Sequence, residues 1–383
     1  MTLRHFEPRD RVCTVITDAS KMAALENDWN NLWFKAKGSV FQTYSLTLHS
    51  WNEVARPNGH SLFCVVVYEA GQMSLVFPLV RYRRGPFWIV RPLSPNSVKI
   101  TDVLVDPDSD VRQNIRLAWS TIEKSSQACI IDMPHVVVGS ALELQIQSKR
   151  HIGRDANIAP FADFHNQTDW SQFIEKSGIN SKQQLNRKRK KLAEMGRFEV
   201  VEIDPVADPT YAAQLLDWMF GQKRLWGERV GKNGNWLTSD AYRRFLIGWA
   251  TDPASTAKTK IYAILIDNQP IAANVASFCL SHVDGIIAGF HADPKYAKYS
   301  PGLVLDEFIM RGAFDKRLNV EFGIGSEAFK LQWSRNAKTD IMSYYIPQNL
   351  SGAAIAKWWH IKQQIDSHRE ERAGRRRAQQ TKR

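Results

Sequence analysis

The stretch from Ile261 to Trp333 decides the expected fold: IYAILIDNQPIAANVASFCLSHVDGIIAGFHADPKYAKYSPGLVLDEFIMRGAFDKRLNVEFGIGSEAFKLQW. Three apolar runs separated by short polar turns open it, and they predict consecutive strands over 261–266, 271–280 and 283–290. Ser300-Pro301-Gly302 then predicts a helix start, because Ser is a good N-cap and Pro at the first helical position already has a helical φ. A fourth strand over 319–322 and a short helix ending at Trp333 complete the stretch.

The predicted helix start at Ser300 has the features of an anion site. Gly302 carries no side chain, and no acidic residue precedes Asp306 in the helix. Unpaired N–H groups and the positive helix end attract negative charge, worth roughly 0.3–1 kcal/mol from the dipole alone. A pyrophosphate would fit there. The alternative interpretation is that Ser-Pro-Gly only begins a helix cleanly.

Composition limits what the chain can be. It has 383 residues, 44% hydrophobic and 11% aromatic, which is enough for two ordinary cores. Lys and Arg number 51 against 39 Asp and Glu, so the formal net charge is +12, which favours anionic partners. The N-terminus is too charged for a signal peptide and no apolar run is long enough to span a bilayer, so we expect a soluble, cytoplasmic protein.

The sequence shows no sign of a metal or nucleotide-loop site. It contains no Walker loop, zinc-ligand cluster, nucleophile elbow or Rossmann fingerprint. The four cysteines lie in strand-like apolar runs, and we interpret them as buried thiols in a reducing compartment, although their spacing leaves a disulfide open. They are Cys13, Cys64, Cys129 and Cys279.

The order of predicted elements occurs twice. Each half reads as a strand, two helices, three strands, a helix, a strand and a helix, with the first half beginning near 12–16 and the second near 198–203. A last strand over 340–346 completes the second half. We therefore predict an α/β (α+β) protein of two domains, each a mixed, mostly antiparallel sheet flanked by helices. The expected boundaries are 1–165 and 166–350, with a basic helix over 182–195 at the junction and a basic C-terminal helix or tail over 351–383.

Several motifs occur in a characteristic order: VFQ at 40–42, VFPL at 76–79, NRKRKKL at 186–192, YSPG at 299–302, FGIG at 322–325 and FKLQW at 329–333. By these motifs the chain resembles the CelD/BcsL-type acetyltransferases, a double-domain group of the GNAT superfamily related to the FemAB-like aminoacyl ligases. The resemblance implies two GNAT-like domains that face one another. It also implies an acyl-CoA donor, acetyl-CoA in particular, held mainly by the second domain, and an acceptor between the two.

The resemblance assigns donor-binding residues. In GNAT enzymes the turn into the central helix binds the pyrophosphate of coenzyme A, and the strand before that helix forms hydrogen bonds with the pantetheine. This implies phosphate contacts at Ser300, Gly302 and Leu303, and a position beside the thioester for Gly289 to Asp293. Tyr299, in the same turn, is also assigned to the donor site. The corresponding first-half turn contains three carboxylates that would repel a pyrophosphate, so we expect no second donor site there. They are Asp106, Asp108 and Asp110.

Lys330 lies where the resembling enzymes have a lysine that contacts the donor. The resemblance implies that its ammonium binds a phosphate or stabilises the oxyanion formed at the attacked carbonyl. The alternative is that Phe329, Leu331 and Trp333 are core residues and Lys330 extends into solvent. Phe329 stands where the family usually has tyrosine and Glu321 where it usually has aspartate, so one obvious general acid is missing.

The sequence leaves the general base open. His291 follows a strand end near the presumed thioester, and an unperturbed imidazole titrates near neutral pH. Asp293 and Glu327 are alternatives. A lone loop histidine is more often structural, and many acyl transfers to amines need only positioning and an ordered water.

Three interpretations of the basic helix over 182–195 remain open. It is a solvated bridge between domains, or Arg187 and Lys190 face the cleft and hold an anionic acceptor such as a nucleotide sugar, or it binds tRNA. The basic tail over 351–383 is a solvated helix end, or it contacts anionic lipid or a ribonucleoprotein.

Aromatic residues near the predicted cleft are candidates for acceptor binding. Trp226 and Trp236 flank the loop 227–234, which we predict to be a mobile lid, and Trp333 follows Lys330 closely. We assign Trp226 and Trp333, with Arg187 and Lys190, to the substrate.

The sequence therefore predicts an acyltransferase without a metal that moves an acetyl group from acetyl-CoA to an amine or hydroxyl of a sugar-containing acceptor. The alternatives are a FemAB-like transferase that uses aminoacyl-tRNA and a non-catalytic protein that binds an anionic polymer.

Overall fold

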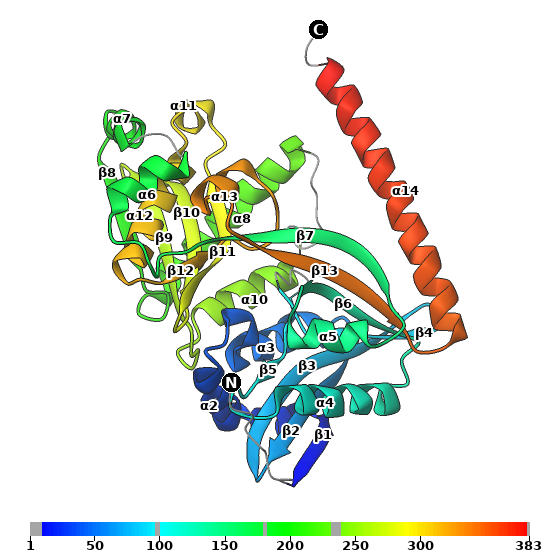
Figure 1. Cartoon of the computed structure of the whole chain (residues 1–383). Helices are drawn as coiled ribbons and strands as arrows, with labels where there is room; N and C mark the ends of the chain where they lie inside the picture. The colour runs from blue at the N-terminus through cyan, green and yellow to red at the C-terminus, as the bar shows by residue number, and fades with distance from the viewer. Residues whose placement is uncertain (1–9, 96–99, 179–181, 231–238, 381–383) are drawn as a thin grey trace.

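The computed structural model describes residues 10–95, 100–178, 182–230 and 239–380 (Figure 1). Two halves of similar construction lie side by side, and a long C-terminal helix leaves them at one edge (Figure 1). Within the described residues, no helix combines the length and the apolar character needed to cross a bilayer.

The first half contains the predicted strand and helix order. Its elements are β1 (Arg11–Ile16), α1 (Ala19–Ala23), α2 (Glu26–Ala36), η1 (Val40–Gln42), α3 (Tyr44–Ser50), η2 (Trp51–Ala55), β2 (Ser61–Glu69), β3 (Gln72–Arg84), β4 (Phe87–Pro92), β5 (Leu104–Val105), α4 (Val111–Ser125), β6 (Ile130–Val137), α5 (Ala141–Gln147) and β7 (Ile152–Ala162).

The second half repeats this order after two connecting helices. Its elements are α6 (Trp170–Ser177), α7 (Lys182–Ala193), β8 (Phe198–Ile203), α8 (Pro209–Val230), α10 (Asp240–Ala250), β9 (Lys258–Ile266), β10 (Gln269–Phe278), β11 (His282–Phe290), α11 (Pro294–Ala297), α12 (Pro301–Asp315), β12 (Asn319–Glu321), α13 (Ala328–Trp333), β13 (Lys338–Pro347) and α14 (Leu350–Gln380).

The two halves share one sheet because they exchange their last strands. The strand order is β1-β2-β3-β4-β6-β13-β7-β12-β11-β10-β9-β8. β7 belongs to the first half in sequence but pairs with β12, and β13 comes last in the second half but pairs with β6. β7 and β13 also pair with each other and cross the molecule between the halves (Figure 1). The predicted strand over 340–346 is present as β13 (Lys338–Pro347), although its partners β6 and β7 both precede the second half's sheet in sequence. The strand β7 was not predicted.

Helices cover both faces of the sheet, which explains its continuous apolar strands. In β2 alternate residues enter different cores: Cys64 and Val66 face α2 and α3, whereas Val65 and Val67 face α4. The core against α2 and α3 also contains residues of α8, α10 and β9, so it is common to both halves. This shared core holds the two halves together as a single body.

Some local predictions differ from the structure. The sequence after Asp18 predicts one continuous helix, but the structure has two, because α1 ends at Ala23 and α2 begins at Glu26. The sequence also predicts that Thr238 caps a helix; Thr238 lies outside the described residues, and the side chain of Ser239 caps α10. All four cysteines are free, and Cys64 and Cys279 are buried as expected, whereas Cys13 and Cys129 are only half-buried.

Candidate functional site

The N-terminus of α12 lacks the side-chain cap that the sequence predicts at Ser300. Ser300 has left-handed backbone angles (φ 51°, ψ 60°), and its side chain does not cap the helix. Its carbonyl accepts hydrogen bonds from Leu303 N (3.0 Å) and Val304 N (3.3 Å). Pro301 has no N–H, and the Gly302 N–H has no hydrogen-bond partner within the described part of the chain. An unpaired N–H at a positive helix end is a binding site for an anion.

A lysine of the basic helix α7 reaches this helix start. Lys188 Nζ donates to Ser300 Oγ over 3.2 Å. Burial lowers the pKa of the Lys188 ammonium. A cation near the positive end of a helix is unfavourable unless an anion is bound, since helix N-termini favour negative charge. Lys188 therefore adds to the anion-binding character of the α12 start.

Phe290 explains why residue 302 is glycine. A Cβ on Gly302 would lie 2.4 Å from Cε1 of Phe290, at the end of β11. Phe290 is 42% exposed, so its ring covers the helix start while one side remains open to solvent. Tyr299 and Leu303 are half-buried and pack against the second half's core.

β11 and β12 separate after a short contact. They run parallel and pair only at His282 with Asn319, Val283 with Val320 and Asp284 with Glu321. Beyond Glu321 the chain follows β7 instead, with Phe322 N donating to Pro160 O (3.1 Å). On this side, the β11 edge over 285–290 has no strand partner among the described residues. An unpaired strand edge of this kind can bond an extended ligand through its backbone groups.

A group of ionisable side chains lies where the two strands part, which we call the vertex cluster: Cys279, His282, Asp284 and Glu321. Asp284 Oδ2 accepts from Val40 N of the first half (3.2 Å) and contacts His282 Nε2 (3.2 Å). Cys279 Sγ donates to the same oxygen over 3.7 Å. Asp284 is 5% exposed, so this network is shielded from water.

Charge within the vertex cluster shifts two pKa values upward. Burial, reinforced by the nearby Asp284 charge, raises the pKa of Glu321 to about 7. The pKa of His282 is also raised, because attraction to Asp284 and Glu321 outweighs the opposing effect of burial. A carboxyl group with a pKa near neutrality can accept a proton at physiological pH. In the sequence alone, Glu321 is distinguished only by standing where the resembling family usually has aspartate.

Lys330 lies in a second polar group. Its ammonium donates to Ile324 O (2.7 Å), pairs with Glu327 (2.9 Å) and is 11% exposed. It therefore does not extend freely into solvent. The charge of Lys330 also lowers the pKa of Lys223 on α8, although burial is the larger cause.

Trp226 joins this group through Lys223. Lys223 Nζ lies 5.0 Å from the centre of the Trp226 ring, a cation–π contact. Trp226 and Lys330 were both predicted site residues, and the structure connects them through Lys223. No sequence signal identified Lys223, because one lysine in a long helix has no distinctive pattern. Trp236 and residues 231–234 of the predicted lid lie outside the described residues.

The residues predicted around the thioester have structural partners. The Nδ1 atom of His291 accepts from Asp293 N (3.1 Å), and its ring contacts Tyr296. Asp293 caps α11, because its side chain accepts from Lys295 N (2.8 Å). A Cβ on Gly289 would lie 3.1 Å from the backbone of Met219, so glycine there permits the close approach of α8.

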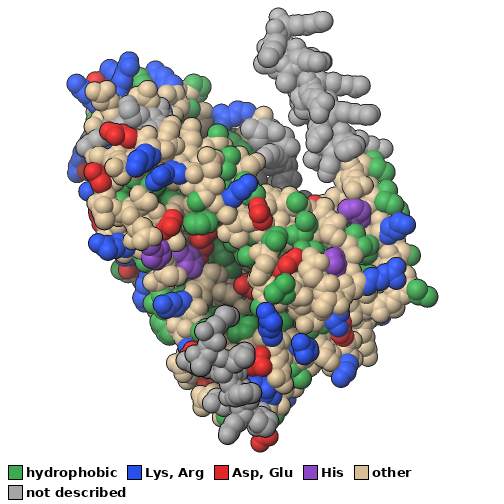
Figure 2. Space-filling model, viewed as in Figure 1, with side chains coloured by type: hydrophobic (Ala, Val, Ile, Leu, Met, Phe, Trp, Pro, Cys, Tyr) green, Lys and Arg blue, Asp and Glu red, His purple; other side chains and the backbone are tan. Residues whose placement is uncertain are grey.

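The remaining predicted acceptor residues lie elsewhere. Trp333 is fully buried and stacks on Trp170 in the core of the second half, away from any substrate surface. Arg187 and Lys190 are on the exposed side of α7. The side of α7 that faces α12 carries Lys188 and Arg189 instead, and Arg189 pairs with Glu307 over 2.6 Å. Lys and Arg side chains gather over α7 in Figure 2.

A metal has one candidate location in the described residues. Cys279, His282 and Asp284 each offer a ligand atom, and these atoms lie within 4.8 Å of one another. In the structure Cys279 Sγ and His282 Nε2 each contact Asp284 Oδ2.

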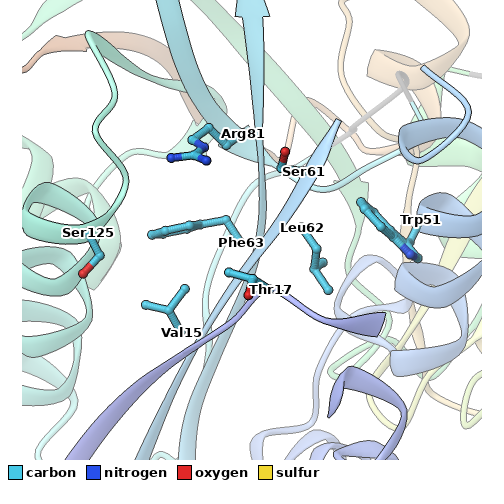
Figure 3. A pocket seen from close by; sticks show the side chains of 8 residues that line it. All are labelled: Val15, Thr17, Trp51, Ser61, Leu62, Phe63, Arg81 and Ser125. Atoms are coloured by element: carbon cyan, nitrogen blue, oxygen red, sulfur yellow. The ribbon is translucent and has the colours of Figure 1, made fainter. Parts of the chain in front are cut away.

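A cavity of ≈620 Å³ opens in the first half (Figure 3). Phe63 and Arg81 line it from the sheet, and Trp51 and Ser125 line it from the helices on either side. The guanidinium of Arg81 already has two partners. Its Nη1 donates to Ser126 O (3.1 Å), and the group stacks on the Trp88 ring. The cavity contains no residue of the second half, so we do not assign it to the reaction.

Comparisons with known proteins agree with this geometry. Residues 180–331 match the model of an acetyltransferase (GNAT) domain. The structure is similar to FemX, with a TM-score of 0.58 and 11% identity over 88% of this chain and 98% of that chain. A search of curated proteins found no match.

Two further solved structures have the same double fold. One is the C-terminal domain of a putative lysylphosphatidylglycerol synthetase from Agrobacterium fabrum, with a TM-score of 0.53 and 13% identity over 88% of this chain and 96% of that chain. The other is L-PGS from Bacillus licheniformis, with a TM-score of 0.50 and 10% identity over 89% and 96%. Residues 180–331 are therefore similar in sequence to an acetyltransferase (GNAT) domain, and the whole chain has a fold similar to that of FemX.

Proposed function

We propose that the chain transfers an acyl group, an acetyl group in the simplest case, from acyl-CoA to an amine or hydroxyl of a sugar-containing acceptor. One observation carries the proposal: β11 parts from β12 after Asp284, and its open edge over 285–290 leads to an uncapped helix start that a lysine approaches. A strand edge and a cationic helix end in this order match the pantetheine and the pyrophosphate of coenzyme A.

The donor would extend from α12 towards the vertex cluster. Its pyrophosphate would accept from the Gly302 N–H and from Lys188, and its pantetheine would bond the free edge of β11 over 285–290. The thioester would then end near Asp284 and Glu321, where the strands meet. His291 and Asp293 lie at the other end of β11, so they would flank the pantetheine and not the acyl carbon.

Glu321 is our candidate for the proton acceptor. The acceptor's nucleophile would attack the thioester carbon, the C–S bond would break, and the nucleophile's proton would pass to the Glu321 carboxylate. The coenzyme A thiolate leaves and takes up a proton. His282 and Asp284 are the charged neighbours that set the affinity of Glu321 for that proton.

Lys330 and Lys223 supply positive charge on the α8 and α13 side. Two lysines that sense each other's charge, with Lys330 paired to the exposed carboxylate of Glu327, suit a site for an anionic group. We propose that they hold a phosphate or carboxylate of the acceptor, or the oxyanion of the transition state, with Trp226 beside them.

Titration calorimetry with acetyl-CoA tests the proposal. Lys188→Glu and Lys190→Glu reverse the same charge two residues apart on α7, but only Lys188 contacts Ser300. We expect Lys188→Glu to weaken binding about 10- to 100-fold, because it removes a charge-assisted contact of about 1.5–3 kcal/mol. Lys190→Glu is the matched control and should bind like the unmodified chain. Absence of binding by the unmodified chain, or equal weakening by both variants, would overturn the donor assignment.

The exposed basic face of α7 favours a second candidate, transfer of an aminoacyl group from aminoacyl-tRNA. A polyanionic donor at the α12 start would extend over Arg187 and Lys190, which coenzyme A has no need to contact. Titration with aminoacyl-tRNA separates the two: Lys190→Glu should then weaken binding as strongly as Lys188→Glu. If neither donor binds, the remaining alternative is the non-catalytic polymer-binding protein.

A further inference from the structure

The C-terminal helix α14 is attached to the body by its first turns. Ala356 and Trp359 are buried in a cluster with Ile89, Ile130 and Tyr345 on the back of the first half's sheet. The guanidinium of Arg84 lies 4.1 Å from the centre of the Trp359 ring. One turn later Gln363 Nε2 donates to Asp155 Oδ1 of β7, and beyond this contact the helix runs away from both halves (Figure 1). One side of its beginning is therefore fixed, and the rest of the helix extends clear of the body.

A different side of the same helix exposes large apolar residues. Trp358 is 58% exposed, Ile361 45% and Ile365 48%. Their spacing of three and four residues places them on one stripe, because residues at these separations are neighbours on a helix. Lys362 Nζ lies 5.6 Å from the centre of the Trp358 ring, at the border of the stripe. A tryptophan and two isoleucines bordered by a lysine have the composition of a helix at a membrane interface.

The charge of this segment is unusually positive. Residues 351–383 contain nine Lys and Arg against three Asp and Glu, a net charge of +6, which is half of the chain's +12. The apolar stripe ends in sequence at Ile365, since His368 and Arg372 occupy the next positions at this spacing. A parallel second copy would bring these like charges together, which disfavours a coiled coil as the partner. RNA would use the charges but has no need of the apolar stripe.

We propose that α14 is a membrane-docking helix that lies on an anionic lipid surface, with Trp358, Ile361 and Ile365 inserted at the headgroup level. The basic residues of the segment would meet acidic lipid headgroups, while the buried Trp359 side keeps the helix fixed to the first half. The docking would hold the acyltransfer site close to the bilayer without a spanning segment. This inference does not depend on the identity of the acyl donor.

Vesicle flotation of the full chain tests this inference. Vesicles of phosphatidylcholine alone are compared with vesicles that also contain phosphatidylglycerol. We expect the chain to float with the anionic vesicles only, and salt to release it. The variant Trp358→Ser/Ile361→Ser/Ile365→Ser should partition at least tenfold more weakly. A matched control, Phe34→Ser/Val138→Ser/Leu144→Ser, changes three exposed apolar residues elsewhere and should float like the unmodified chain.

Several results would overturn the inference. These are no flotation of the unmodified chain, equal flotation of the stripe variant, or equal loss in the control variant. Light scattering and binding to a homopolymeric RNA complete the test. Self-association that the stripe variant abolishes, without flotation, would assign the stripe to a second copy. RNA binding that the stripe variant retains, again without flotation, would assign the segment to nucleic acid. Circular dichroism confirms that each variant is folded.

Discussion

The two halves have the same strand order but opposite chemistry where their parallel strands pair. In the first half the final registered pair of β4 and β6 is Val90 with Ile131, and both side chains are fully buried. In the second half the final pair of β11 and β12 is Asp284 with Glu321, beside His282. The same backbone arrangement thus carries a closed apolar core in one half and a group of ionisable side chains in the other.

The N-termini of α4 and α12, the helices that follow the two β-meanders, differ in the same way. Asp110 caps α4 by accepting from Gln113 N (3.1 Å), and Lys35 pairs with Asp106 (2.7 Å). Ser300 does not cap α12, and Lys188 approaches it. The first half satisfies its helix start with its own carboxylates, which leaves no room for an anion. The first half therefore closes its helix start, whereas the second half leaves its helix start and the β11 edge open.

The largest effect that we expect concerns Glu321 of the vertex cluster. Glu321→Gln removes the proton acceptor and should lower kcat about 10²- to 10⁴-fold, the usual contribution of general base catalysis. The unmodified enzyme should gain activity as pH rises through about 7, because the Glu321 carboxyl must lose its proton, whereas the variant should be slow throughout. Glu321→Asp should recover part of the rate. A pH–rate profile that the Gln variant leaves unchanged would remove Glu321 from the mechanism.

The close approach of Phe290 to α12 predicts the next largest effect. Gly302→Ala would place a methyl group against the Phe290 ring, so we expect a loss of about 1–3 kcal/mol in the free energy of unfolding, as for other overpacked sites. The double variant Gly302→Ala/Phe290→Ala should recover part of that loss. Urea unfolding measures both. An unaffected single variant would mean that the ring moves aside freely and that glycine there serves the ligand alone.

Asp306 on α12 predicts a pH dependence of stability, larger than that expected from Asp102 of the first half, whose pKa burial raises to about 6. Burial raises its pKa to about 7, and Asn274 donates to it over 3.2 Å. Since the unfolded carboxyl ionises near 4, the native state loses stability as pH rises from about 4 to 7. Asp306→Asn removes this loss and should be more stable than the unmodified chain by on the order of 1–3 kcal/mol at pH 8. Thermal unfolding should show the difference shrinking towards pH 4.

The smallest effects that we expect are changes in the free energy of unfolding from substitutions at the starts of α4 and α12. Asp110→Ala removes a side-chain cap and should cost about 1 kcal/mol of stability. Ser300→Gly removes no cap and relieves a left-handed φ of 51°, so it should be neutral or stabilising by less than about 1 kcal/mol. Urea unfolding of both variants gives the two values. Equal losses would contradict the difference in capping.

Element order and strand extent could be predicted from local pattern. The bounds predicted for 61–69 and 198–203 coincide with β2 and β8, because buried strands read as apolar runs between turn residues. The helix at Pro301 also begins as predicted. β7 was missed because its sequence, IGRDANIAPFA, mixes Gly, Pro and charged residues and has no apolar period. Its partners in the sheet define it as a strand.

Some features of the candidate site can likewise be predicted from the sequence, whereas others depend on the tertiary structure. The residue types that mark it locally, YSPG before a helix and Lys330 after a glycine-rich turn, are visible in the chain alone, since turn and cap preferences depend on near neighbours. Long-range packing selected Lys188 over Arg187 and Lys190, placed Trp333 in the core, and brought Val40 of one half to Asp284 of the other. Contacts between residues far apart in sequence depend on which strands pair and which helix face is covered, and no local pattern contains that information.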